Sequence, residues 1–349
     1  MTTYFIILLI PILASLVPWR AVGLLSYLQW FGYAFVLIII IGYRHEVGGD
    51  WFGYLRNGDF QTLVVEGVDY YGNGDIAYEW LYWFSANYLN GIYATNLICA
   101  IIFISGLWRL CSITPYPWVS VAISIPFFVA VVAMGYTRQS AAVGFSLWGL
   151  VDLLKGRVNR YYIFIIIGAF FHKTVIFMLI YGYLYNFQKK KLFKLLIFLS
   201  STLALLAFFM IGKIEFFVYN YITNTTMTSH GAIVRVLMNI MPSLLLFYNK
   251  DKWIERYSDY KLWFLFAISS ISLLPLSFYF STFADRIAIY FIPIQIVVLT
   301  RMLILINSTY YRTLFLIFIF TLYFIALFIW LFYGVHSLNW IPYRNFLLQ

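Results

Sequence analysis

Ionisable side chains suited to proton transfer or anion binding stand at the ends of long apolar stretches in this sequence. His172 and Lys173 interrupt one such stretch. Because an ionisable group at a membrane edge is costly to keep there, residues of this kind are by default candidates for function. An unperturbed histidine titrates near neutral pH, which makes His172 a candidate general base. The alternative is a histidine that packs a helix and bonds a backbone carbonyl.

Arg138 and Gln139 follow Met134–Thr137 and open another apolar stretch that predicts a helix. A helix N-terminus beside an arginine combines the helix dipole with a bidentate guanidinium, and this pair of features favours phosphate binding.

The segment Arg44–Asp50 directly follows an earlier apolar stretch and contains Glu46 and the turn signal Gly48-Gly49. Its charged groups could bind an anionic lipid headgroup. The alternative is interfacial snorkelling next to a tight turn.

Further along the chain, Arg235 and Asn239 are four residues apart and so share one helix face. Asp285-Arg286 are expected at the start of a helix, with Tyr290 one turn later; a cap and a local ion pair are the alternative there. If they converged, five cations would form a basic cradle for a multivalent anion such as diphosphate: Arg44, Arg138, Lys173, Arg235 and Arg286.

Several aromatic and polar residues are candidates for sugar binding: Trp51, Tyr54, Gln139, Asp285 and Tyr290. For the aromatic residues, a belt at the membrane interface is the stronger alternative. The motifs of serine hydrolases, zinc proteases and nucleotide-binding loops are missing from the sequence. Cys99 and Cys111 would lie about 18 Å apart on one helix, too far for a disulfide. We therefore predict no metal site and no cofactor.

The elements that must position these residues are membrane-spanning helices. Hydrophobic residues make up 63% of the 349 residues and charged residues 10%, against roughly 25% charged in soluble domains. The net charge of +10 is scattered over short loops, which indicates membrane topology rather than nucleic-acid binding. The predicted fold class is an all-α polytopic membrane protein with about twelve transmembrane helices. Their approximate ranges are 4–18, 22–42, 93–110, 117–134, 139–154, 160–171, 174–187, 193–211, 232–248, 261–280, 286–304 and 312–334. The pair at 160–187 is either one kinked helix or a short re-entrant pair.

The basic loops predict the orientation. With both termini outside, 15 of the 23 lysines and arginines fall on the cytoplasmic side, as the positive-inside rule requires. They are Arg20, Arg109, Lys155, Arg157, Arg160, Lys189, Lys190, Lys191, Lys194, Lys250, Lys252, Arg256, Lys261, Arg301 and Arg312. All four histidines and most acidic residues then lie outside.

The whole chain, residues 1–349, is predicted to form a single membrane domain with two outer loops. The first, Tyr43–Gly91, contains a predicted interfacial helix at Ile76–Asn90. The second covers Gly212–Gly231, which is rich in Asn and Thr.

The order of these motifs resembles a known family. Arg44-His-Glu-Val-Gly-Gly-Asp50 followed by Tyr54 is similar to the R-x-x-VG-x-D-x-x-x-Y segment of the EpsG/Wzy-like bacterial polysaccharide polymerases, with Gly49 where Thr is usual. Later landmarks resemble that family in the same order: Glu79, Arg138-Gln139, His172-Lys173, Asp285–Tyr290 and Ile341–Arg344.

The resemblance implies a bacterial inner-membrane glycosyltransferase, similar to the lipid-phosphate-dependent (GT-C-like) enzymes. It would join oligosaccharide units carried on undecaprenyl diphosphate, as donor and acceptor, at the outer face of the membrane. Its products would be O-antigen, capsule or exopolysaccharide, and a chain-length regulator is a further partner that it allows. General-base candidates are His172, Asp50 and Glu79, in no fixed order.

Two other classes remain open from the sequence. One is a transporter or flippase for the same lipid-linked sugars, which should carry charges at mid-membrane in two related halves. The other is a membrane O-acyltransferase that decorates the polymer, which would also use a histidine at the membrane edge.

Overall fold

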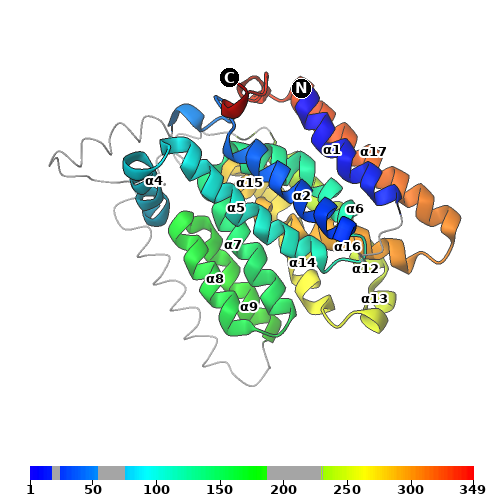
Figure 1. Cartoon of the computed structure of the whole chain (residues 1–349). Coiled ribbons are helices and arrows are strands. Elements are labelled where there is room, and N and C mark those ends of the chain that lie inside the picture. Colours follow the sequence, from blue (N-terminus) through cyan, green and yellow to red (C-terminus); the bar gives the residue numbers. More distant parts are fainter. Residues whose placement is uncertain (18–23, 54–74, 187–228, 230) are drawn as a thin grey trace, which may run out of the picture. The chain divides into compact units, whose positions relative to one another are not determined.

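Helices form all the regular elements in residues 1–17, 24–53, 75–186, 229 and 231–349, the part of the chain that the computed structural model describes (Figure 1). Apolar runs long enough for several helical turns explain why. In chain order the main helices are α1 (Thr2–Leu16), α2 (Leu24–Gly42), α4 (Ile76–Tyr88), α5 (Gly91–Ser112), α6 (Pro117–Ser124), α7 (Thr137–Leu154), α8 (Val158–Phe171), α9 (Leu179–Asn186), α12 (Ala232–Tyr248), α13 (Lys250–Arg256), α14 (Tyr260–Tyr279), α15 (Ser281–Ala288), α16 (Pro293–Leu305) and α17 (Thr309–Tyr333).

Four of the described helices, α2, α5, α14 and α17, are long and apolar enough to cross a bilayer, and the number rises to six if each of two bent pairs counts as one span. The protein is therefore a multi-pass membrane protein. Each predicted stretch in the described residues coincides with helix, but several helices are short: α1 has 15 residues and α8 has 14. The number twelve stays a prediction. The predicted helix at 193–211 lies outside the described residues, and so does the predicted outer loop at 212–231 except for residues 229 and 231.

The predicted pair at 160–187 is two short antiparallel pieces rather than one long helix. Helix α8 ends at Phe171, and a 3₁₀ segment, η2 (Lys173–Met178), leads into α9. The Tyr161 hydroxyl, near the start of α8, donates to the Met178 carbonyl and its ring lies against Gly182 of α9. With 14 residues, α8 is about 21 Å long, shorter than the hydrocarbon core. His172 stands at the tip of this hairpin.

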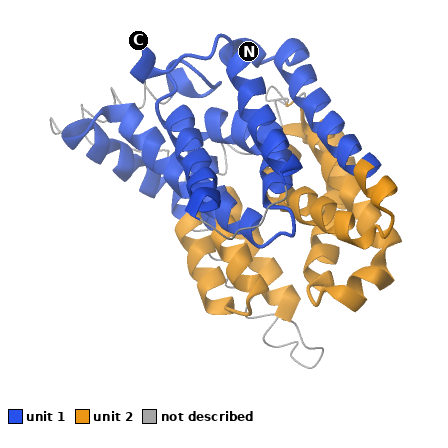
Figure 2. Cartoon of the chain, turned by 45° about the vertical axis from the view of Figure 1, so that its right-hand side comes forward, with its two compact units in different colours: residues 1–145, 170–172, 314–349 blue, residues 146–169, 173–313 orange. Residues whose placement is uncertain are grey.

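The chain divides into two compact units (Figure 2). Unit 1 comprises residues 1–145, 170–172 and 314–349. Its centre is α5, which packs against α2, α4 and α6. Helices α5 and α7 approach so closely that a Cβ on Gly144 would lie 2.6 Å from the Ile102 carbonyl oxygen.

The C-terminal residues of unit 1 fold back onto the loop that follows α2. The backbone of His45 donates to Arg344, that of Phe346 to Tyr43 and that of Gly48 to Asn339. Gly48 has φ +110°, a conformation that glycine adopts without strain.

Two side chains complete this attachment. The indole of Trp340 donates to the Ala130 carbonyl at 2.7 Å, within the π-helical segment η1 (Ile125–Ala133). Burial raises the pKa of the Tyr343 hydroxyl, against smaller opposing effects of Asn345 and the Arg44 charge. The hydroxyl therefore stays protonated and donates to the Ile40 carbonyl at 2.8 Å.

Unit 2 comprises residues 146–169 and 173–313, and α12, α14, α15 and α16 form its core. The carboxylate of Asp259 accepts two bonds from Arg301, at 2.7 and 2.8 Å, and one from the indole of Trp263 at 2.9 Å. The Arg301 guanidinium also lies over the rings of Trp253 and Tyr257.

One predicted helix boundary in unit 2 was wrong. Asp285 and Arg286 lie in the last turn of α15, not at the start of a helix. A 3₁₀ turn, η4 (Ile289–Phe291), follows, and α16 begins at Pro293 after a 43° bend. Proline lacks an N–H and favours the first position of a helix. Helix α16 therefore begins at Pro293, seven residues after the start at Arg286 that the sequence predicted.

The close approach of α5 and α7 predicts the effect of a single methyl group. Gly144→Ala would push a Cβ into the backbone of Ile102 and Phe103 and should cost about 1–3 kcal/mol of stability. Gly32→Ala in α2 is the matched control, because no atom lies within 4 Å of its added Cβ. Thermal melting of the purified protein in detergent measures both, and equal melting temperatures would contradict the packing.

Candidate active site

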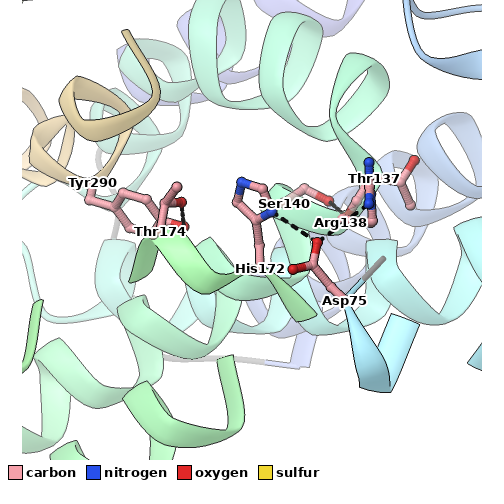
Figure 3. A network of polar contacts seen from close by, with 7 residues as sticks. All are labelled: Asp75, Thr137, Arg138, Ser140, His172, Thr174 and Tyr290. Atoms are coloured by element: carbon pink, nitrogen blue, oxygen red, sulfur yellow. Dashed lines mark hydrogen bonds and ion pairs between the residues drawn. The ribbon is translucent and has the colours of Figure 1, made fainter. Parts of the chain in front are cut away.

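His172, Asp75 and Arg138 meet in unit 1, although they are far apart in the chain (Figure 3). The Nδ1 atom of His172 lies 3.1 Å from Oδ2 of Asp75. The Nη1 atom of Arg138 lies 3.5 Å from the same oxygen. One carboxylate oxygen thus bridges an imidazole and a guanidinium.

Arg138 is more exposed than the other two side chains. The side chains of His172 and Asp75 are 9% and 7% exposed, whereas that of Arg138 is 30% exposed. Water therefore competes little for the contact between imidazole and carboxylate, which strengthens it. The arginine reaches from the buried carboxylate toward the surface.

Each residue is held by the end of a helix. Asp75 is the N-cap residue of α4, but its side chain makes no cap bond to that helix and turns to His172 and Arg138 instead. Arg138 is the second residue of α7, and its guanidinium lies 5.9 Å from the ring centre of Tyr78. His172 follows the last residue of α8.

Asp75 was not among the residues that the sequence singled out for the site. The available signal was an acid directly after the sequence Gly72-Asn73-Gly74, whose composition is a turn signal, and before a predicted helix on the predicted outer side. Glu79 carried a similar signal one turn later, so sequence alone could not choose between them. In the structure Glu79 is half-buried in the first turn of α4.

Arg44 lies in the interior of unit 1, with 1% of its surface exposed. Its guanidinium donates to the carbonyls of Ile41 and Val47, at 2.6 and 3.2 Å. It also donates to the side chains of Asn96 and Thr137, at 3.1 and 2.6 Å. The structure thus gives Arg44 a role in joining α2, α5 and α7, and its binding to diphosphate stays a prediction.

Other residues predicted for the site in unit 1 have these positions. Asp50 is half-buried, Gln139 is 4% exposed, and Trp51 is 2% exposed in the apolar cluster with Tyr78 and Tyr82. Tyr54 lies outside the described residues. With its ring covered in this way, Trp51 packs the core, and sugar stacking by it stays a prediction.

In unit 2, Arg235 and Asp285 form a buried ion pair. The amide of Asn239 donates to the Ala288 carbonyl at 2.9 Å and accepts from Gln295. Tyr290 is 1% exposed, and its hydroxyl bonds that of Thr174 at 3.1 Å. Lys173 and Arg286 are half-buried. Arg235 and Asn239 share a buried face, as their spacing predicted.

Within the described ranges, no three or more His, Cys, Asp or Glu side chains are grouped so that they could hold a metal ion. Cys99 and Cys111 are both free and buried on α5.

A carboxylate and an imidazole in contact, next to an arginine, can accept a proton and stabilise an anion. In a comparison with models of known protein families, the model described as the EpsG family matches residues 27–345. Neither the search of curated proteins nor that of solved structures found a match.

The buried position of Arg44 predicts a large effect of a charge-conserving change. Arg44→Lys should lose the bonds to Asn96 and Thr137, because an ammonium cannot reach the acceptors that the planar guanidinium joins. We expect a loss of about 1.5–3 kcal/mol in stability. Arg256→Lys, on the exposed face of α13, is the control and should melt like the parent protein. An unchanged melting temperature for Arg44→Lys would show that these bonds do not tie the helices.

Proposed function

The chain belongs to the EpsG family, whose model covers residues 27–345, and from this premise we propose that it joins lipid-linked oligosaccharide units into a polysaccharide. The units would be carried on undecaprenyl diphosphate, and transfer would take place at the outer face of the cytoplasmic membrane. The contact among Asp75, Arg138 and His172 is the observation that carries the proposal. Such a transfer needs a base for the acceptor hydroxyl and a cation for the leaving group.

Helix α7 supports an outer-face site. Arg138 is at its N-terminal end, and the exposed residues Lys155, Arg157 and Arg160 follow its C-terminal end. With 18 residues, α7 is about 27 Å long, so its two ends are about one hydrocarbon thickness apart, although α7 is not among the four described helices that are apolar enough to cross a bilayer on their own. If the three exposed cations face the cytoplasm, as the positive-inside rule predicts, then Arg138 faces the outer surface.

In the proposed reaction, the acceptor hydroxyl oxygen attacks the anomeric carbon of the donor sugar. A new carbon–oxygen bond forms, and the bond from that carbon to the diphosphate oxygen breaks. The hydroxyl proton passes to Nε2 of His172, and undecaprenyl diphosphate leaves with the electron pair. The imidazolium later returns its proton to solvent. A base of this kind contributes about 10²- to 10⁴-fold to the rate.

Arg138 is the cation best placed for the leaving group. It is partly exposed, it is next to the base, and the helix end on which it stands favours anions. Its planar guanidinium can donate two parallel bonds to two oxygens of one phosphate, a geometry that an ammonium does not reproduce. Lys173 and Arg286 remain further candidates.

A reconstituted assay tests the proposal. Purified protein in liposomes is given lipid-linked repeat units, and glycan length is followed by gel. We expect elongation by the parent protein, a fall of about 10²- to 10⁴-fold for His172→Gln, and a fall of roughly ten- to a hundred-fold for Arg138→Lys. His336→Gln and Arg256→Lys change exposed residues of the same types and should elongate normally.

Other outcomes would each exclude part of the proposal. Translocation of the lipid-linked units without elongation would favour a transporter, and acyl transfer to the polymer would favour an acyltransferase. Normal elongation by His172→Gln, with an inactive Asp50→Asn or Glu79→Gln, would move the base to a carboxylate.

The orientation can be tested by cysteine labelling without removing native cysteines, since Cys99 and Cys111 are buried. Asn90 and Lys252 are exposed, at the α4–α5 junction and in α13. In intact cells an impermeant maleimide should label Asn90→Cys but not Lys252→Cys. Lys252→Cys should be labelled only after the membrane has been permeabilised. The reverse pattern would put the site on the cytoplasmic face.

A further inference from the structure

We propose that Asp75 is a positioning residue for His172: its carboxylate keeps the imidazole proton on Nδ1 and leaves the lone pair of Nε2 to take the proton of the acceptor. The inference deepens the proposed function and rests on it for the identity of the proton donor. The tautomer of the histidine, in contrast, does not depend on the proposed function, because it can be measured in the protein without substrate.

The geometry of the contact selects the tautomer. An ionised carboxylate is an acceptor, so an imidazole nitrogen 3.1 Å away must donate its hydrogen to it. Because Asp75 Oδ2 approaches Nδ1, the neutral ring carries its hydrogen there. The opposite nitrogen, Nε2, is then the one with a lone pair, as a base requires.

Arg138 keeps Asp75 in the charged form that this role needs. Its guanidinium approaches the same oxygen, and a cation next to a buried carboxyl group favours ionisation. The carboxylate has the lone pairs to accept from both partners. When His172 takes a proton, the adjacent negative charge stabilises the imidazolium without itself receiving the proton.

The position of Asp75 is set by packing rather than by its own helix. The side chains of Tyr78, Tyr82 and Ser85 are buried on one face of α4, which packs against α5. The backbone carbonyl of Asp75 accepts from Glu79 at 3.0 Å and so begins the helix. The carboxylate is thus fixed before substrate arrives, which is what an orienting residue must achieve.

The test separates positioning from simple structural support. Asp75→Asn keeps the shape of the side chain but offers a hydrogen donor as well as an acceptor, so either tautomer of His172 can bond to it. We expect a fall on the order of 10²- to 10⁴-fold in kcat, little change in KM and an unchanged melting temperature. Asp75→Glu keeps the carboxylate and should restore part of the rate. Asp251→Asn, on the exposed face of α13, is the control and should have the parent kcat.

A second readout needs no substrate. In protein labelled with ¹⁵N-histidine, the signals of His172 are identified by their loss in His172→Gln. The parent protein and Asp75→Glu should show the hydrogen on Nδ1, and Asp75→Asn should show a mixture of tautomers.

Unchanged ¹⁵N shifts of His172 in Asp75→Asn, or a parent kcat in a folded Asp75→Asn, would overturn the inference. If the parent protein does not elongate glycans but Asp75→Asn changes the tautomer, the proposed function fails and the positioning role stands.

Discussion

The guanidinium of Arg44 is the interaction on which the arrangement of unit 1 depends. It joins the end of α2 to Asn96 on α5 and to Thr137, the first residue of α7. Thr137 also donates to Asn96 at 3.2 Å, so the three side chains form one connected set. Because Arg138 follows Thr137 directly, this set fixes where α7 begins and so where the partly exposed Arg138 stands. Helix α5 in turn packs against α4, whose N-cap residue is Asp75.

The site residues also border backbone that departs from regular α-helix. The π-helical segment η1 comes shortly before Arg138, and the 3₁₀ segment η2 directly follows His172. In a membrane such backbone is tolerated where protein groups satisfy it. Trp340 does so for the Ala130 carbonyl, and Tyr161 does so for Met178. The C-terminal residues therefore stabilise a helix distortion that ends shortly before α7 begins at Thr137.

The sequence predicted the helices well because each is an apolar run, and such a run can be recognised from the local sequence without knowing what it packs against. The polar residues Arg138 and Gln139 predicted a helix start within two residues of the observed start at Thr137, and His172-Lys173 predicted an interruption where α8 ends. What the sequence could not show depended on tertiary contacts. Asp75 meets His172 across 97 positions, and nothing local distinguishes it from Glu79. Trp51 and Tyr290 are aromatic residues of the kind that stack on sugar rings, but both are buried. Their burial depends on packing partners far along the chain, which the local sequence does not show. Arg44 was expected at a surface for the same reason, because a charge in a loop gives no sign of the acceptors that bury it.

Geometry distinguishes ion pairs that hold the fold from the one that suits a reaction. Asp259 and Arg301 make two short bonds, with indole donors on the carboxylate and aromatic rings on the guanidinium. The surrounding residues hold both side chains of such a pair in place. Separating the two would leave a buried charge without a counter-charge. Asp75 and Arg138 make one contact at 3.5 Å, and the arginine is three times as exposed as Arg301 (30% against 10%). Its geometry allows the guanidinium to turn toward an incoming anion at modest cost, while His172 remains on the carboxylate. Of these two pairs, Asp75–Arg138 is therefore the one that suits catalysis.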